Sequence, residues 1–313
     1  MRGTASVGDT AATRSVRPTR GLAIGFAGLV AATWALIVLG ALVRANHAGL
    51  ACPDWPLCFG EFLPQLDVRV AFEYFHRVLA GSLTLVFLGL GVAAWRQPAV
   101  PASTRRLLQV AAVLLGVQIL LGAITVWELL ASWTVTSHLV AGNAFAVALI
   151  WIAADVYESG ASARHVARHV PVGPGAKAAV ATAALLLAVQ VVLGGLVSSR
   201  YAGMACPEWP TCSGGLWFPS WQGPVGLHLL HRTNGYLLLG ALASAGWWCR
   251  GVPRLRSLLW GGVAVGLGQM LVGIANVLLR LPMEVTGLHS ALAALLVLGV
   301  TLAVREAFRR AAC

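Results

Sequence analysis

Charged side chains are scarce in this sequence: 11% of its 313 residues are Asp, Glu, Lys or Arg, whereas 58% are hydrophobic. An ordinary soluble domain carries about 25% charged residues. This shortage excludes a soluble globular protein. The long apolar runs that take the place of charge indicate a membrane protein with several spans.

Acidic residues are the scarcer of the two signs, 11 against 22 basic ones, so the formal net charge is +11. A charge of this size is compatible with nucleic-acid binding, but the sequence lacks a basic stripe with interleaved aromatic residues. Its basic residues cluster instead in short loops between apolar runs, as cytoplasmic anchoring charges do. We therefore expect the lipid bilayer, and no nucleic acid, as a partner.

Two further absences argue against a signal peptide and against a transporter. The first apolar run, about residues 22–45, is too long for a signal-peptide core and lacks a small-residue cleavage site, so it predicts a membrane span. No matched Gly or Pro interruption falls at mid-membrane, and such broken helices are the mark of a transporter built from repeats. A transporter is therefore the weakest of the functions considered.

Eight apolar runs each approach the roughly 20 residues that a transmembrane helix needs. The fold class predicted is an all-α membrane protein. The polar residues 1–20 predict a disordered cytoplasmic tail. The eight spans fall near residues 22–45, 70–95, 106–128, 132–156, 176–199, 226–249, 256–279 and 283–305.

Basic residues divide unequally between the two sides that these spans imply. Sixteen of the 22 lie on the side of both termini, which the positive-inside rule makes cytoplasmic. The protein is thus expected in a bacterial-type plasma membrane, with its cysteine-containing loops outside. The remaining six are Arg44, Arg69, Arg77, Arg200, Arg232 and Arg280.

The sequence also repeats itself. Ala51-Cys52-Pro53-Asp54-Trp55-Pro56-Leu57-Cys58 matches a segment 154 residues later, Ala205-Cys206-Pro207-Glu208-Trp209-Pro210-Thr211-Cys212. With four helices per half, both halves insert in the same sense, as parallel repeats about an axis along the membrane normal. We expect two pseudo-symmetric four-helix bundles, residues 21–157 and 176–313, joined by a cytoplasmic linker at 158–175.

Four histidines lie near the outer ends of the second, fourth, sixth and eighth spans: His76, His138, His231 and His289. Ionisable groups at membrane depth are costly, and the default interpretation is functional. A single histidine would more often form a hydrogen bond between helices. Four at matched spacing instead predict that each half holds an iron cofactor between two imidazoles, with haem the best fit. Zinc is less suited, because two histidines per half supply too few ligands.

Glu73 precedes His76 by three residues and so shares nearly the same helix face. The second half has His228 at the equivalent place. This asymmetry suggests that the first half performs chemistry, with Glu73 moving protons, while the second holds a cofactor. A plain helix-terminal acid favoured by the helix dipole is the alternative.

Each cysteine pair, Cys52 with Cys58 and Cys206 with Cys212, encloses five residues in an extracytoplasmic loop, where disulfides persist. A structural disulfide and a redox relay both remain open. Cys249 and Cys313 lie on the cytoplasmic side and are expected to be free thiols.

Four arginines near the outer surface are candidates for pairing with haem propionates, and snorkelling to lipid headgroups is an equal alternative. They are Arg44, Arg77, Arg200 and Arg232. His165 and His169 read as solvated, His47 and His228 as ambiguous. The twelve Trp residues fall largely near helix ends, as an aromatic belt does.

The Cys-Pro-acid-Trp-Pro-x-Cys loops, the run Glu73-Tyr74-Phe75-His76-Arg77 and its second-half counterpart ending in His231-Arg232 resemble the haem A synthase (CtaA/Cox15) family over about residues 22–305. The resemblance implies oxidation of the C8 methyl of haem O to the formyl group of haem A, which serves terminal oxidases. Phe75 replaces the isoleucine usual in the family, a swap between apolar residues.

Carried over by position, the resemblance implies that His76 and His138 ligate the substrate haem, with Glu73 as the essential carboxylate. His231 and His289 would ligate a haem b for electron transfer. Cys52–Cys58 would be the functionally important disulfide and Cys206–Cys212 the more structural one. Haem O synthase, an unidentified electron carrier and a second copy of the chain are candidate partners.

Two rival functions remain at this point. A di-haem b-type electron carrier, such as a quinol-oxidising subunit, shares four histidines but has no need for Glu73. A thiol–disulfide oxidoreductase built on the cysteine pairs needs no haem and would be colourless.

Overall fold

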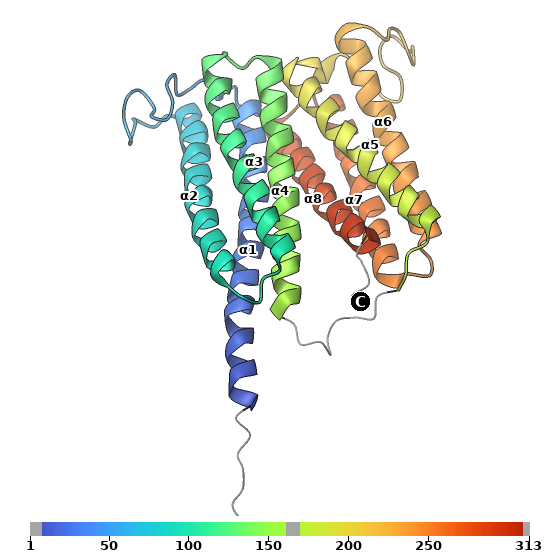
Figure 1. Ribbon diagram of the computed structural model, residues 1–313. Coiled ribbons are helices and arrows are strands. Elements are labelled where there is room, and N and C mark those ends of the chain that lie inside the picture. Colours follow the sequence, from blue (N-terminus) through green and yellow to red (C-terminus); the bar gives the residue numbers. More distant parts are fainter. Residues whose placement is uncertain (1–7, 161–169, 309–313) are drawn as a thin grey trace, which may run out of the picture.

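The computed structural model describes residues 8–160 and 170–308. Within these residues the chain folds into eight α-helices and a short 3-10 turn, which confirms the predicted all-α fold (Figure 1). The elements are α1 Gly8–Ala45, α2 Val68–Arg96, α3 Ala102–Trp127, α4 Ser132–Gly160, α5 Pro174–Ser199, η1 Ala202–Met204, α6 Gly223–Trp248, α7 Pro253–Leu278 and α8 Met283–Phe308.

Local sequence explains where these helices begin. The Asp67 carboxylate accepts a hydrogen bond from the Val70 N–H at 2.8 Å and so caps the start of α2. Helices α5, α6 and α7 each have a proline at the first or second position, where its missing N–H costs nothing.

Seven of the eight helices are long and apolar enough to cross a membrane, and α6 is the exception among the described residues. Its 26 residues suffice in length, but His228, His231, Arg232 and Asn234 fall within two turns of one another. The eight-span expectation is thus supported for seven helices and unsupported by hydropathy for α6.

The N-terminal segment differs from expectation. Helix α1 begins at Gly8, so residues 8–20, expected to be a disordered tail, extend the first membrane helix at the end away from the loops. Extending a formed helix costs far less than nucleating one, which favours this continuation. Figure 1 shows α1 projecting past the other helices at one end of the molecule. Residues 1–7 lie outside the described part.

The helices pack side by side in two sets. In the first, α1 packs against α2 and α4, and α3 packs against α4; in the second, α5 packs against α6 and α8, and α7 packs against α8. The sets meet where α1 contacts α8, α4 contacts α5 and α4 contacts α8. Helices α4 and α8 therefore lie at the centre of the molecule.

Two hydrophobic cores fill the same end of the molecule. One joins α1 to α4 around Phe26 and Ile152, the other joins α5 to α8 around Leu242 and Leu255, and all four side chains are fully buried. Lipid tails are as apolar as leucine, so close packing rather than exclusion of water holds helices together here.

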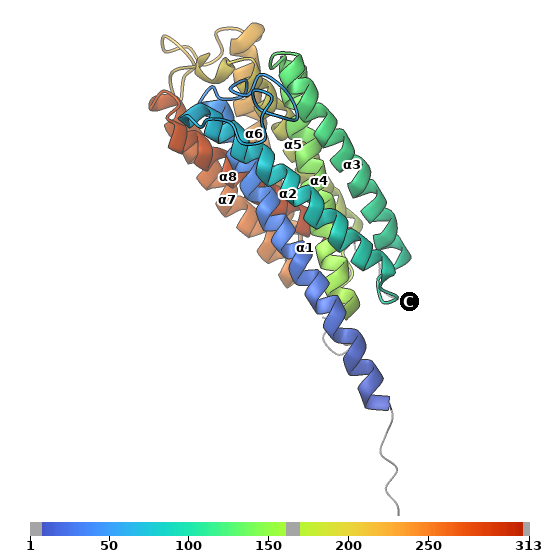
Figure 2. The same ribbon diagram turned by 90° about the vertical axis from the view of Figure 1, so that its left-hand side faces the viewer.

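The opposite end, called the loop end below, carries residues 46–67 and 200–222 (Figure 2). Figure 1 shows that the two segments lie apart, the first beside α2 and the second beside α6. Each segment contains one disulfide, Cys52–Cys58 and Cys206–Cys212, as expected. Each disulfide is buried, with Val70 or Leu229 of the following helix packed against it.

Candidate functional site

Each of the four histidines lies two helical turns from a core residue, toward the loop end. Residues seven apart share a helix face, and in every case the residue seven positions on is buried in a hydrophobic core. The imidazoles therefore face the interior of the helix assembly rather than lipid. The pairs are His76 with Leu83, His138 with Phe145, His231 with Leu238, and His289 with Leu296.

A glycine on the preceding helix lies against each imidazole. A methyl group added at any of these glycines would come within 3.1–3.3 Å of the histidine Cε1 atom, closer than side chains ordinarily approach. The absent side chain lets the imidazole rest on the neighbouring backbone. The pairs are Gly40 with His76, Gly122 with His138, Gly194 with His231, and Gly273 with His289.

Glutamine stands four residues before three of these glycines, at Gln118, Gln190 and Gln269, and so lies on the same helix face. The Gln118 Nε2 atom is 3.2 Å from His138 Nε2, and the Gln190 Nε2 atom is 3.2 Å from His231 Nδ1. Gln269 likewise interacts with His289.

These glutamines and glycines form a residue set that the sequence analysis missed. The spacing Gln-x-x-x-Gly on α3, α5 and α7 was the available signal. The segments Gln118-Ile119-Leu120-Leu121-Gly122 of α3 and Gln269-Met270-Leu271-Val272-Gly273 of α7 are alike, but sequence alone does not indicate that their Gln and Gly contact a histidine.

The residues present fit the haems that the resemblance implies. The two imidazoles of each set, His76 with His138 and His231 with His289, lie within electrostatic range of each other. Among the described residues, the buried Nδ1 atoms of His76, His138 and His289 have no hydrogen-bond partner. Leaving a buried polar atom unpaired costs about 1–3 kcal/mol, so such atoms mark a place where a ligand belongs.

Nothing in the described part of the chain groups three or more His, Cys, Asp or Glu side chains for a metal ion. The histidines instead come in pairs, one from each of the two even-numbered helices of a set. Paired imidazoles suit an iron whose other four ligands come from a porphyrin.

Glu73 is buried, with 5% of its surface exposed. One carboxylate oxygen pairs with the Arg77 guanidinium, and the other accepts a hydrogen bond from the Cys52 N–H at 2.9 Å. Arg77 also donates to the carbonyls of Cys52, Asp54 and Leu57. Glu73 is thus fixed against the first disulfide loop, one helical turn from His76.

The second half repeats half of this arrangement. Arg232 donates to the carbonyls of Cys206, Glu208 and Thr211 at 2.8–3.1 Å, as Arg77 does in the first loop. In place of Glu73, the buried His228 has its Nδ1 atom 2.9 Å from the Ala202 carbonyl. The second loop is therefore held by arginine without an adjacent carboxylate.

An acidic residue closes the turn in each loop. The Asp54 carboxylate accepts hydrogen bonds from the N–H groups of Phe59 and Gly60, both at 2.7 Å. The bond from Gly60 is the main reason that the pKa of Asp54 lies below its ordinary value. The pKa of Glu208 is lowered in the same way, chiefly by the Gly215 N–H.

The four arginines named as partners for propionates occupy different surroundings. Arg77 and Arg232 are directed at loop carbonyls, Arg200 is exposed, and Arg44 spans the two helix sets. Arg44 donates to Tyr201 Oη and to the Ser198 carbonyl, both at 3.0 Å, and lies over the Tyr201 ring. Pairing with a propionate remains a prediction for all four.

The remaining sequence candidates take no part in these sites. His47 is exposed in a left-handed turn after α1. Cys249 is a buried free thiol, as expected. His165, His169 and Cys313 lie outside the described residues.

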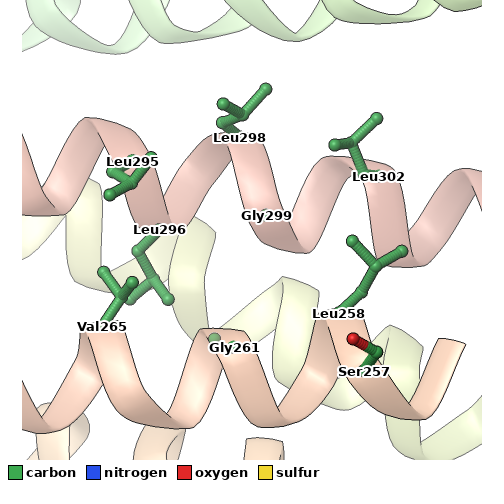
Figure 3. A pocket seen from close by; sticks show the side chains of 10 residues that line it. Ser257, Leu258, Gly261, Val265, Leu295, Leu296, Leu298, Gly299 and Leu302 are labelled. Carbon is green, nitrogen blue, oxygen red and sulfur yellow. The ribbon is translucent and has the colours of Figure 1, made fainter. Parts of the chain in front are cut away.

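A cavity of about 240 Å³ lies away from the histidines, between α7 and α8 (Figure 3). Its lining is apolar, with Leu295, Leu298 and Leu302 of α8 above Leu258 and Val265 of α7, and it contains no ionisable side chain. It therefore offers nothing for catalysis or iron ligation.

A known protein family matches most of the chain. The sequence profile of the COX15-CtaA family, described as cytochrome oxidase assembly protein, matches residues 24–71 and 65–301. These ranges include all four histidines, Glu73 and both disulfides.

Curated proteins named Heme A synthase are similar over most of the chain. The protein from Halalkalibacterium halodurans is 30% identical over 270 residues, covering 83% of this chain and 88% of the relative. The one from Shewanella oneidensis is 28% identical over 307 residues, 85% of this chain and 90% of the relative. The one from Alkalihalophilus pseudofirmus is 31% identical over 269 residues, 83% and 89% respectively.

Proposed function

The chain belongs to the COX15-CtaA family of cytochrome oxidase assembly proteins, and from this premise we propose that it is a haem A synthase, an integral membrane oxidoreductase. Its substrate is haem O, whose C8 methyl group it oxidises to a formyl group. The product, haem A, serves terminal oxidases. The observation that carries the proposal is the set of four histidines, each facing the interior two turns from a core residue.

Two four-helix bundles give the chain two haem sites. We assign residues 21–157 to the first bundle, 158–175 to a linker and 176–313 to the second. The packing supports this division, because each contact within α1–α4 has a counterpart within α5–α8, and α1–α8 mirrors α4–α5. Such a pattern is expected of parallel repeats about an axis along the membrane normal.

In the first bundle His76 and His138 would hold the substrate haem, and in the second His231 and His289 would hold a haem b. The haem b supplies one-electron transfer when bound. The protein's part is to fix the imidazoles, which Gly40, Gly122, Gly194 and Gly273 allow by leaving room beside each ring.

Glu73 makes the first bundle reactive. Oxidation of a methyl group removes electrons together with protons. The electrons would pass to the haem b, and a buried carboxylate one turn from His76 is placed to accept the protons. Its bonds to the Cys52 N–H and to Arg77 fix its position relative to the first loop. We infer that the first disulfide matters for activity because it shapes the backbone that holds Glu73. His228 offers no such carboxylate in the second bundle.

The proposed orientation places both termini in the cytoplasm and the loop end outside. Sixteen of the 22 basic residues then lie on the cytoplasmic side. The two disulfides at the loop end support this, because disulfides persist in extracytoplasmic compartments.

The first experiment is to purify the protein and to extract its haems for chromatography. We expect haem b together with haem O or haem A. Glu73→Gln should keep both haems and lose conversion of haem O by at least about a hundredfold, the usual contribution of a proton-transferring residue. Glu61→Gln, an exposed acid in the same loop region, is the matched control.

A second experiment tests which bundle holds haem b. His231→Ala or His289→Ala should remove the haem b signal while haem O is still taken up. Two equivalents of haem b, with Glu73→Gln fully active in electron transfer, would instead establish the di-haem carrier. Loss of haem O from the His231 variant would reverse the two halves.

A further inference from the structure

Three of the four site histidines contact a glutamine, and His76 does not. The helix before it, α1, carries Leu36 four residues ahead of Gly40, where α3, α5 and α7 carry Gln118, Gln190 and Gln269. Leu36 is packed against the first hydrophobic core. The Nδ1 atom of His76 has no hydrogen-bond partner among the described residues, and the same holds for His138 and His289, so what sets His76 apart is the missing glutamine.

The contrast is greatest with His231, the counterpart of His76 in the second bundle. The Gln190 amide nitrogen lies 3.2 Å from the His231 Nδ1 atom and donates to the His231 carbonyl at 3.1 Å. Asn234 holds that glutamine, donating to its Oε1 atom at 2.7 Å and to the Leu186 carbonyl at 3.0 Å. His231 is therefore fixed by a two-residue amide chain.

Both members of this amide chain are replaced by leucine in the first bundle. Leu36 occupies the place of Gln190, and Leu79, three residues after His76, occupies the place of Asn234. Both leucines pack against the first core. A leucine fills the same space but offers no hydrogen bond, so rotation of the His76 side chain breaks none.

We propose that His76 is the dissociable haem ligand of the first bundle, and that Gln190 with Asn234 are positioning residues that keep His231 in place. This rests on the proposed function. A bis-histidine substrate site must release one ligand to admit a reactant or to exchange substrate for product. His138 is contacted by Gln118, so the unanchored His76 is the one that leaves.

The test exchanges the anchors between the bundles. Leu36→Gln with Leu79→Asn installs the amide chain in the first bundle, and Gln190→Leu with Asn234→Leu removes it from the second. Carbon monoxide, added to the dithionite-reduced protein purified with its haems, probes the open ligand position. Its binding rate and extent are read from the visible spectrum, and the ferric low-spin EPR signals report the imidazoles directly.

We expect carbon monoxide to bind one haem in the unaltered protein. The first-bundle exchange should slow that binding about tenfold, the scale of one added hydrogen bond. The second-bundle exchange should make the haem b reactive as well. Spontaneous transfer of haem to apomyoglobin, followed in the same samples, should be slower in Leu36→Gln with Leu79→Asn. It should be faster in Gln190→Leu with Asn234→Leu.

Gln118→Leu distinguishes the two ligands of the first bundle. Should this variant alone raise carbon monoxide binding, with the Leu36 exchange without effect, His138 would be the dissociable ligand and the inference would be overturned. If the double variants misfold, Leu36→Gln and Gln190→Leu are measured singly with the same expectation. Protein that carries no haem at all would refute the proposed function. If the protein converts haem O but Leu36→Gln binds carbon monoxide at the unaltered rate, this inference alone is refuted.

Discussion

At the scale of single residues, the contact between each glycine and its histidine can be tested directly by substitution. An alanine at Gly273 would place its methyl 3.1 Å from the His289 Cε1 atom, so the ring must shift by a few tenths of an ångström. We expect Gly273→Ala to shift the low-spin EPR signal of the haem b proposed for the second bundle and to lower its retention. Gly261 lies on the same helix with nothing within 4 Å. Gly261→Ala should leave the signal unchanged and stabilise α7 by up to about 1 kcal/mol.

Asp54 and Glu208 give the loops a dependence on pH. The pKa of each is lowered in the folded protein, by bonds from Gly60 and Gly215 respectively. Their contribution is therefore complete above the unfolded-state pKa of about 4 and is lost as pH falls through the lower folded-state pKa. Reduction of the loop disulfides by a phosphine should speed up between pH 5 and pH 3, values about one unit either side of that pKa. In Asp54→Asn, the Cys52–Cys58 bond should be reduced at the same rate at both pH values, while Cys206–Cys212 keeps its pH dependence. A pH-dependent rate for Cys52–Cys58 in that variant would contradict the assignment.

At the scale of elements, each disulfide loop is held to the helix after it by one arginine. Arg232 satisfies three loop carbonyls, and each left unpaired where it is buried costs about 1–3 kcal/mol. Arg232→Gln should therefore lower the thermal midpoint of the purified protein and weaken retention of the haem b proposed for the second bundle. Arg280→Gln, at an exposed arginine that follows α7, is the control, and equal effects of the two changes would count against this role.

At the scale of the whole molecule, the two helix sets are joined by polar contacts between α1, α4, α5 and α8. Arg305 of α8 pairs with Asp155 and Glu158 of α4 at 2.7–2.8 Å, at the end opposite the loops. Removing one partner of a largely buried ion pair costs about 3 kcal/mol, less where the partner is partly exposed. Arg305→Leu should lower the unfolding temperature, and Asp155→Asn with Glu158→Gln should partly restore it. Independent, additive effects would show that the network does not couple the sets.

The fold followed from the sequence because apolar length, basic loops and cysteine spacing are local signals. The helices and both disulfides were predicted on that basis and are present. The start of α1 was missed, since polar residues 8–20 gave no apolar period to extend. The low hydropathy of α6 was also missed. The span was predicted from its length, and the polar residues of His228–Asn234 were considered only as candidate site residues.

The site was predicted in part. Its histidines stood out because ionisable residues are rare in apolar runs. The contacts that orient them did not, because Gln190 and Gly194 meet His231 only when α5 lies beside α6. The arginines show the same limit. Arg77 and Arg232 looked like anion partners from position alone, and only the folded loops reveal the carbonyls that they contact.

The spacing of the loop cysteines bears on how the protein is made. Four cysteines allow three pairings, but each native partner lies only six residues away within one loop. Four helices separate the two loops in the chain. In the proposed orientation, which places the loops outside, the first loop can be oxidised while the ribosome is still adding the helices that follow. Synthesis in vectorial order favours the native pairing without later reshuffling by an isomerase.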